Sequence, residues 1–310
     1  MKIHFPLAIA ATTLVLHAQQ AFQTEVLLIE REGGFRRVWL TAATKTQIRY
    51  REYKDSMDTK DENISKFSAV YILEPDEFFK AMDLYEAGKY KEARVALAKV
   101  SEQFKPIRAL DNNPSTLAAF HEMECMRKMG DLDALSSALG SFIKDPLTRE
   151  SQLRQIELYA LWDAARTKSW DRLDILARQR VNEKLPGDQR AQVGYLHGLA
   201  LDGLKRPEEA LFAYQIAMTA EAGASAEIAR DAALRVLAIH MADHEVRQAI
   251  NVWGTPDENK NSNGYDRLSE AGAVATLYEI SHGAEFPLPA AFKPLLQYKP
   301  KEHDAVAPDY

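Results

Sequence analysis

Hydrophobic residues follow two different periods along the 310-residue chain, and the change falls near Pro75. Before this proline, apolar and polar positions alternate in short runs, which is the pattern of half-buried β-strands. After it, apolar residues recur at the spacing of one face of an α-helix. We therefore predict a small antiparallel β module over residues 19–74 and a mainly α-helical domain over residues 75–283.

The β module is expected to contain roughly four or five short strands in a twisted antiparallel sheet or open barrel. Ile48 and Tyr50 fall on one face of the clearest alternating run, 47–53. Gly33-Gly34 marks a turn between the two earlier runs, 25–29 and 35–41. The polar stretch 54–63 predicts a loop. So small a unit is close to the lower limit for independent stability, and we expect it to dock on the first helices. The predicted strands lie within 25–29, 35–41, 47–53 and 67–73.

The helical domain repeats a unit of helix, tight turn and helix. Its turns, at Gly88, Gly130, Lys168 and Lys205, recur at intervals of roughly 40 residues, which is typical of helical repeat architectures. A fifth hairpin and a capping helix are expected to follow. The predicted helices cover 76–86, 91–103, 117–129, 134–143, 153–166, 173–181, 192–204, 208–219, 224–241, 245–253 and 265–280.

The fourth hairpin, residues 192–219, resembles a tetratricopeptide (TPR) repeat. Gly198 stands where the two helices of such a repeat cross closely, and Ala210 and Ala217 are the small residues that permit this approach. Tyr214 is the bulky residue between the helices. The first hairpin has a similar turn, whereas the second and third carry larger residues at the crossing positions. The resemblance implies a TPR-like α-solenoid of helical hairpins.

In TPR arrays the first helices of successive hairpins line a concave groove. The resemblance therefore implies a groove for a protein or peptide partner, with the aromatic and arginine side chains that commonly anchor interfaces. The alternative role for these residues is packing between neighbouring repeats. Transferred by repeat register, the groove consists of Phe78, Met82, Tyr85, Phe120, Arg127, Lys128, Leu158, Trp162, Arg166, Gln192, Tyr195 and Asp202.

The N-terminus predicts export. A weakly positive start, 1–4, precedes an almost wholly apolar run that ends at Leu16, and Ala18 is a small residue at which a signal peptidase could cut. We predict a signal peptide over residues 1–18 and a mature protein in the periplasm or outside the cell. The apolar run is too short to span a bilayer comfortably, and no later run has the length of a membrane helix. We therefore expect no integral membrane segment in the mature chain.

Charge and cysteine content narrow the possible partners. The net charge is −6, and the acidic excess lies in the helical domain. This distribution disfavours a nucleic-acid partner, which would require a basic surface. Cys125 is the sole cysteine, so the chain cannot form an internal disulfide and its stability must come from packing.

Catalytic and metal-binding motifs are weak. His240 and His244 have the spacing of one helical face and could bind zinc, but no third ligand is evident nearby. Ser141 and Lys144 match a Ser-x-x-Lys pair, without the other elements of penicillin-binding enzymes. Cys125 is most simply a buried hydrophobic residue. We predict no metal, no cofactor and no enzymatic activity.

The C-terminal segment, residues 284–310, is rich in proline, which excludes a regular helix over most of its length. Residues 286–298 are too apolar for a solvated linker, and we expect them to lie against the last helices as an extended cap. Residues 299–310 are richer in charge and are expected to be mobile.

These patterns lead to one main hypothesis, an exported TPR-like scaffold that binds a protein or peptide partner in the cell envelope. The alternative is a carbohydrate- or peptidoglycan-associated structural protein. It would use exposed aromatic residues of the β module, especially Trp39, Tyr50 and Tyr53. An enzyme is the third and weakest hypothesis, because no catalytic constellation stands out.

Overall fold

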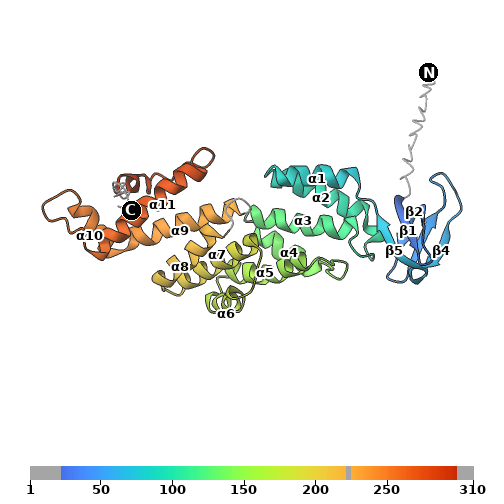
Figure 1. The fold of residues 1–310 in the computed structure, drawn as a ribbon, viewed down its shortest axis with the longest axis horizontal. Coiled ribbons are helices and arrows are strands. Elements are labelled where there is room, and N and C mark those ends of the chain that lie inside the picture. The colour runs from blue at the N-terminus through green and yellow to red at the C-terminus, as the bar shows by residue number, and fades with distance from the viewer. Residues whose placement is uncertain (1–21, 221–224, 299–310) are drawn as a thin grey trace, which may run out of the picture.

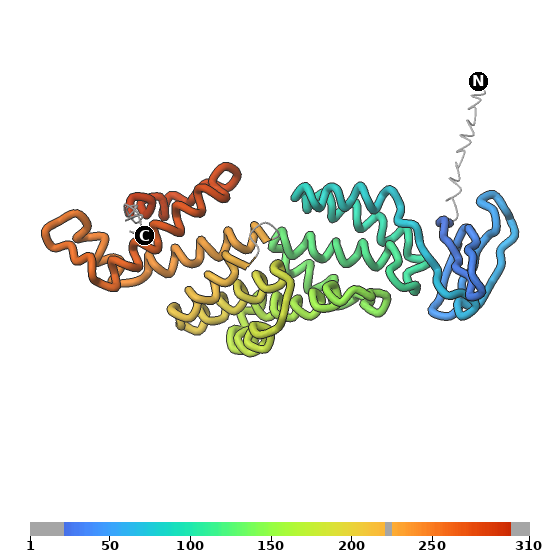
Figure 2. The backbone as a smooth tube through the Cα atoms, in the orientation of Figure 1, coloured from blue at the N-terminus to red at the C-terminus, as the bar shows by residue number. Residues whose placement is uncertain are grey.

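The computed structural model describes residues 22–220 and 225–298. The predicted signal peptide, 1–18, and the charged end of the tail, 299–310, lie outside the described residues. The described chain is elongated, with a small β-sheet at its N-terminal end and helices over the remainder (Figure 1). The path runs from the sheet through successive helices to the helix α11 (Asn263–His282) at the far end (Figure 2).

Five antiparallel strands form the sheet, in the spatial order β4-β3-β2-β1-β5. This confirms the predicted small antiparallel module. The predicted loop over 54–63 is wrong at its end, because residues 60–63 pair with β3 as a strand. Every side chain of this strand is polar, so it gives no apolar alternation in the sequence. The strands are β1 (Thr24–Glu30), β2 (Phe35–Ala43), β3 (Gln47–Arg51), β4 (Lys60–Asn63) and β5 (Phe67–Ile72).

One face of the sheet is buried in a core that also includes residues of the first three helices, α1 (Asp76–Glu86), α2 (Tyr90–Gln103) and α3 (Pro114–Lys128), and β2 packs on the short 3-10 helix Lys105–Ile107 that follows α2. Ile48 and Tyr50 lie on the same face, as predicted, and both are buried. Sheet and helices share one hydrophobic core, which confirms that the module docks on the first helices. The sheet contributes Val26, Leu28, Val38, Leu40, Ile48, Tyr50 and Phe67 to this core.

The predicted helices are all present, and several begin earlier than the apolar period suggested. Polar caps explain two of these earlier starts: the side chains of Asn113 and Asp131 accept hydrogen bonds from backbone N–H groups of the first helical turn. The remaining helices are α4 (Leu132–Ser141), α5 (Glu150–Arg166), α6 (Trp170–Val181), α7 (Gly187–Gly203), α8 (Pro207–Thr219), α9 (Ala226–Ala242) and α10 (His244–Val252).

The four repeated turns share one backbone feature. Gly88, Gly130, Lys168 and Lys205 all have positive φ angles, of 72°, 72°, 53° and 63°. A left-handed residue after a helix is a common way to end it, and glycine adopts this conformation most easily. The two lysines therefore hold the same conformation at a steric cost. The four turns are equivalent in conformation as well as in sequence position.

Helices that are adjacent in sequence pack against each other throughout the described array, and α9 also packs against α11. The apolar half of the C-terminal segment covers this end. Leu288, Leu295 and Tyr298 are buried with residues of α9, α10 and α11, and residues 293–298 form a short 3-10 helix. This confirms that 286–298 packs against the last helices as a cap, whereas the extended backbone predicted there is wrong over 293–298, which is helical. No helix among the described residues has both the length and the apolar content needed to cross a membrane.

Candidate functional site

The predicted partner-binding groove lies mostly inside the helical array. Seven of its twelve side chains are buried: Phe78, Phe120, Arg127, Leu158, Trp162, Gln192 and Tyr195. The other five are half-buried: Met82, Tyr85, Lys128, Arg166 and Asp202. Partner binding by these residues stays a prediction. The side chain of Lys128 is only 9% exposed and is paired with Glu227, so Met82, Tyr85, Arg166 and Asp202 are the ones that a partner could touch without a rearrangement.

A charged network accounts for the burial of Arg127. Its Nη2 lies 3.0 Å from Oε2 of Glu124, and the hydroxyl of Tyr159 on α5 donates to Oε1 of Glu124 at 2.6 Å. Burial opposes the charge of Glu124, but Arg127 and the Tyr159 hydroxyl outweigh it, so the pKa of Glu124 is lowered. Burial and the charge of Glu124 raise the pKa of Tyr159 well above its usual value. The network holds the carboxylate ionised inside the protein.

The start of helix α9 packs against the end of α3, next to this charged network. Oε1 of Glu227, at the start of α9, lies 2.9 Å from Nζ of Lys128 and 3.3 Å from Nη1 of Arg127, at the end of α3. The start of α9 lies beside the end of α3 in Figure 1. The guanidinium of Arg127 also lies over the ring of Trp162, 5.8 Å from its centroid. These contacts join the start of α9 to the end of α3 and bury Arg127 between them.

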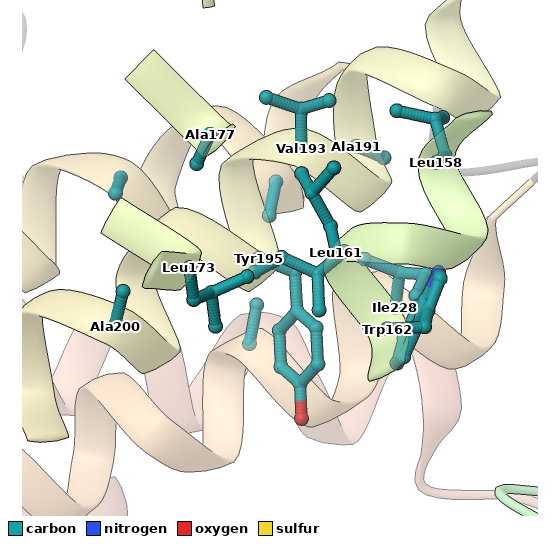
Figure 3. Close-up of a cluster of buried hydrophobic side chains, with 14 of the residues drawn as sticks. Leu158, Leu161, Trp162, Leu173, Ala177, Ala191, Val193, Tyr195, Ala200 and Ile228 are labelled. Atoms are coloured by element: carbon teal, nitrogen blue, oxygen red, sulfur yellow. The ribbon is translucent and has the colours of Figure 1, made fainter. Parts of the chain in front are cut away.

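Two glutamines and a tryptophan form a second buried polar cluster, between α5 and α7. The amides of Gln155 and Gln192 exchange hydrogen bonds of 2.9 and 3.0 Å, and the indole N–H of Trp162 donates to Oε1 of Gln192 at 2.9 Å. Figure 3 shows Trp162 and Tyr195 among the buried side chains of this region. Buried polar groups that bond to one another are satisfied without a ligand. Gln192, Trp162 and Tyr195 thus have a structural role in packing the array.

The structure does not bring His240 and His244 together as a metal site, and it does not expose Cys125 for thiol chemistry. His240 and His244 do not share a helical face, because the extended backbone of Asp243 separates α9 from α10. His240 is buried and His244 is exposed. Cys125 is fully buried, and burial raises the pKa of its thiol to about 12, which keeps it protonated. No group of three or more His, Cys, Asp or Glu side chains in the described ranges could hold a metal ion.

An open cleft of about 530 Å3 runs beside β5, which is an edge strand of the sheet. Five consecutive residues of β5, 68–72, line it. Because consecutive side chains of a strand point to opposite faces, a cleft that touches all five lies along the backbone edge. The opposite wall consists of residues 109–112 and the start of α3, at Pro114 and Leu117. The wall is mixed: Leu110 and Leu117 are apolar and buried, whereas Asp111, Asn112 and Arg149 add charged and polar groups to the lining.

The wall of the cleft is held in place by bonds to a neighbouring loop. Asn112 has a positive φ of 50°, and its N–H donates to the carbonyl of Pro146 at 2.8 Å. Its Oδ1 accepts a hydrogen bond from the hydroxyl of Thr148 at 2.8 Å. Asp145 in the same loop accepts a bond of 2.8 Å from the ammonium of Lys45, next to the sheet. These ties join wall and sheet, so the cleft exists before any partner binds.

The two edges of the sheet differ in chemistry. The edge strand β4 carries three charged residues in four, Lys60, Asp61 and Glu62, and two of them form ion pairs with β3 and the residue after it. Charged side chains on an edge discourage another strand from pairing with it. The opposite edge strand, β5, has the sequence Phe-Ser-Ala-Val-Tyr-Ile and contains no charge. The edge without charged side chains, β5, is therefore the one that borders the cleft.

Sequence reasoning missed this cleft. The charge-free run 67–72 was visible, but its place at an edge depends on the strand order. The wall comes from residues about 40 positions later, whose only local signal is the Asn112-Asn113-Pro114 turn. Comparison with known proteins adds no further assignment: no family model, curated protein or solved structure matches the chain significantly. The TPR likeness therefore remains a resemblance carried by the residues themselves.

Proposed function

We propose that this chain is an exported TPR-like scaffold that binds a protein or peptide partner in the cell envelope. The cleft beside β5 is the observation that carries the proposal. It is open, it places an uncharged strand edge opposite a wall of mixed apolar and polar residues, and it has the dimensions of a ligand site. Surfaces of this kind hold segments of partner proteins in several recognition domains.

The helical array supports the scaffold part of the proposal. Equivalent left-handed turns end the first helix of four successive hairpins. The close contact of Gly198 with Tyr214 matches the crossing that the resemblance implies for a TPR repeat. Short hairpins that pack mainly on their neighbours form extended arrays with large surfaces, which suits a protein that holds others together.

Affinity capture tests the proposal. The chain from Gln19 onward, immobilised and incubated with cell-envelope extract, should retain a defined set of proteins. Ala69→Arg places a bulky charge on the exposed β5 edge and should release that set. The matched control, Ala87→Arg, changes an exposed alanine after α1 and should retain it. Retention of the same proteins by Ala69→Arg would remove the cleft from the proposal, and an empty capture by the unchanged chain would overturn the function.

Export has its own test. Material recovered from the periplasm or the medium should begin near Gln19 when its N-terminus is sequenced. An intact Met1 in a cytosolic fraction would contradict export while leaving partner binding open to the capture experiment.

A carbohydrate- or peptidoglycan-associated role is the second candidate, and the outer face of the sheet favours it. Phe35 and Tyr71 are exposed on this face by 65% and 58%, and Trp39 is half-exposed. Aromatic rings on an open surface can stack on sugars. Tyr50, one of the three residues expected in such a ridge, is fully buried and takes no part. Co-sedimentation with purified peptidoglycan, abolished by Trp39→Ala, would favour this candidate over the first.

A further inference from the structure

The hydrogen-bond pattern of β1 shows whether the backbone groups of each residue bond to β2 or to β5. The N–H of Glu30 donates to the carbonyl of Gly34 at 3.1 Å, so Glu30 bonds toward β2. Backbone groups of successive strand residues point alternately to the two neighbouring strands. The odd-numbered residues of β1 therefore bond toward β5. The register between β1 and β5 is regular from Val26 to Ile29 and shifts only at Glu30, so the alternation holds for Leu27 and Ile29. The hydroxyl of Ser68 reaches the carbonyls of both Ile29, at 3.0 Å, and Glu30, at 3.5 Å.

The same alternation identifies the free groups of β5. Leu27 is paired with Tyr71 and Ile29 with Ala69, so Tyr71 and Ala69 direct their N–H and C=O groups toward β1. Val70 and Ile72 must then direct theirs away from the sheet, into the cleft. Within residues 22–220 and 225–298, no hydrogen bond engages these outward groups.

We propose that the cleft takes an extended segment of the partner as a sixth strand, hydrogen-bonded to Val70 and Ile72. This rests on the proposed function and specifies its ligand. A segment that covers β5 has about six residues, which is a usual strand length. One set of its alternate side chains faces the wall at Leu117 and is apolar, and the other set lies beside Tyr71 on the outer face. β5 itself offers no charge to the segment, so a charged residue of the segment would pair with Asp111 or Arg149 of the opposite wall.

A second copy of the chain fits this edge less well than a single segment. Two β5 strands paired about a two-fold axis would bring two complete sheets together. Each copy would carry its own wall, residues 109–117, beside the shared edge, and the two walls would compete for the same space. A lone strand needs only about 4.8 Å of width. The wall therefore favours a flexible segment of another protein.

Amide hydrogen exchange measured by NMR tests the binding mode directly. The probes are peptides selected from a phage-displayed library of random short sequences on the chain from Gln19 onward. In the free protein, the amides of Ala69 and Tyr71 should exchange slowly and those of Val70 and Ile72 quickly. A bound peptide should slow exchange at Val70 and Ile72 and leave Ala69 and Tyr71 unchanged. The selected sequences should alternate between apolar and other residues.

A proline at position 70 provides the second readout. Val70→Pro removes the outward N–H and places its ring in the cleft, at an edge position where proline is tolerated. Peptide affinity should fall about tenfold or more. Val70→Thr keeps the N–H and the side-chain shape and should bind like the unchanged chain. Circular dichroism melts of both variants report whether the sheet is intact.

Each outcome separates this inference from the proposed function. Selected peptides that bind Val70→Pro as well as the unchanged chain, or that leave Val70 and Ile72 exchanging quickly, overturn strand addition. A library without binders does the same. In all these cases the capture experiment with Ala69→Arg still decides whether the cleft holds a partner in another way. If Val70→Pro has lost its melting transition, the exchange pattern of the unchanged chain alone decides whether a bound peptide adds to β5 as a strand.

Discussion

Gly198 of α7 lies so close to Tyr214 of α8 that a Cβ atom on the glycine would come within 2.5 Å of the tyrosine ring. Tyr214 is fully buried, and Ala210 and Ala217 on the same helix are buried with it. The missing side chain of Gly198 therefore sets the distance between the two helices of the fourth hairpin. Small residues at such crossings decide how closely helix axes approach.

Gly198→Ala should destabilise the protein, because the added methyl group must displace a buried ring or separate the helices. We expect a loss of about 1–3 kcal/mol in the free energy of unfolding, measured by urea denaturation. Gly140→Ala is the matched control: it also adds a methyl group to a helical glycine, but no atom lies within 4 Å of it. The control should be neutral or more stable, since alanine favours helix. Equal effects of the two substitutions would contradict the packing role.

The contact of Glu227 with Arg127 and Lys128 should stabilise the packing of α9 against α3. Glu227→Gln keeps the shape of the side chain and removes its charge, which leaves two largely buried cations with less compensation. We expect a loss of about 1–3 kcal/mol, smaller at high salt. Glu102→Gln breaks an exposed ion pair with Lys105 and serves as the control, with an expected loss below about 1 kcal/mol. A loss no larger than the control's would show that α3 and α9 meet without help from this contact.

The sequence predicted the helices and the turns between them because the apolar period and the turn residues are local features. Gly88 and Gly130 mark turns by residue type alone, and the spacing then locates Lys168 and Lys205. The contact between α3 and α9 could not be predicted in this way. It depends on how all the helices between α3 and α9 pack, which brings Glu227 to Arg127 across a hundred residues. β4 was missed for another reason, since a strand with polar side chains on both faces carries no periodic signal.

Acid should weaken the fold through its buried histidines. Burial lowers the pKa of His197 and of His240. The charged groups around His240 come from three elements: Glu270 and Arg267 on α11, Glu208 on α8, and Asp243 after α9. The folded chain binds these protons more weakly than the unfolded chain, in which histidine has a pKa of about 6.5. The stabilisation is therefore complete above about pH 6.5 and falls as the pH drops below it.

Chemical denaturation at a series of pH values between about 5 and 8 measures this dependence. The free energy of unfolding should decrease toward acid, and His240→Gln should flatten part of the decrease. His244→Gln, at an exposed position four residues later, should leave the curve unchanged. A protein that becomes more stable on acidification in this range would contradict the sign that burial gives.

Glycine at the two lysine turns should relax backbone strain. Lys168 and Lys205 hold φ angles of 53° and 63°, where a Cβ atom is crowded. Lys168→Gly and Lys205→Gly should each raise stability by up to about 1 kcal/mol, the relief being partly offset by the greater freedom of glycine in the unfolded chain. Lys184→Gly, in a loop position without positive φ, should lower or keep the melting temperature. A lower melting temperature for all three variants would show that the positive φ angles of Lys168 and Lys205 do not destabilise the protein.

The C-terminal cap should be essential to the stability of the last helices. Leu288 and Leu295 are each 1% exposed, and Tyr298 meets the ring of Trp253 edge-on with centroids 5.0 Å apart. The N–H of Leu288 also donates to the carboxylate of Glu279 on α11, at 3.2 Å. Burying side chains of this size stabilises a fold by about 1.5–3 kcal/mol each. Removal of the segment would expose the apolar faces of α10 and α11 that it covers.

Truncation after Glu285 should therefore lower the melting temperature by several degrees and increase proteolysis within α10 and α11. Truncation after Tyr298 is the control, because it keeps every buried residue of the cap and should melt like the full chain. The double substitution Leu288→Ala and Leu295→Ala separates packing from chain length, and it should reproduce most of the loss, about 4 kcal/mol or more. If the chain truncated after Glu285 melts like the full chain, the buried contacts of the cap contribute no net stability.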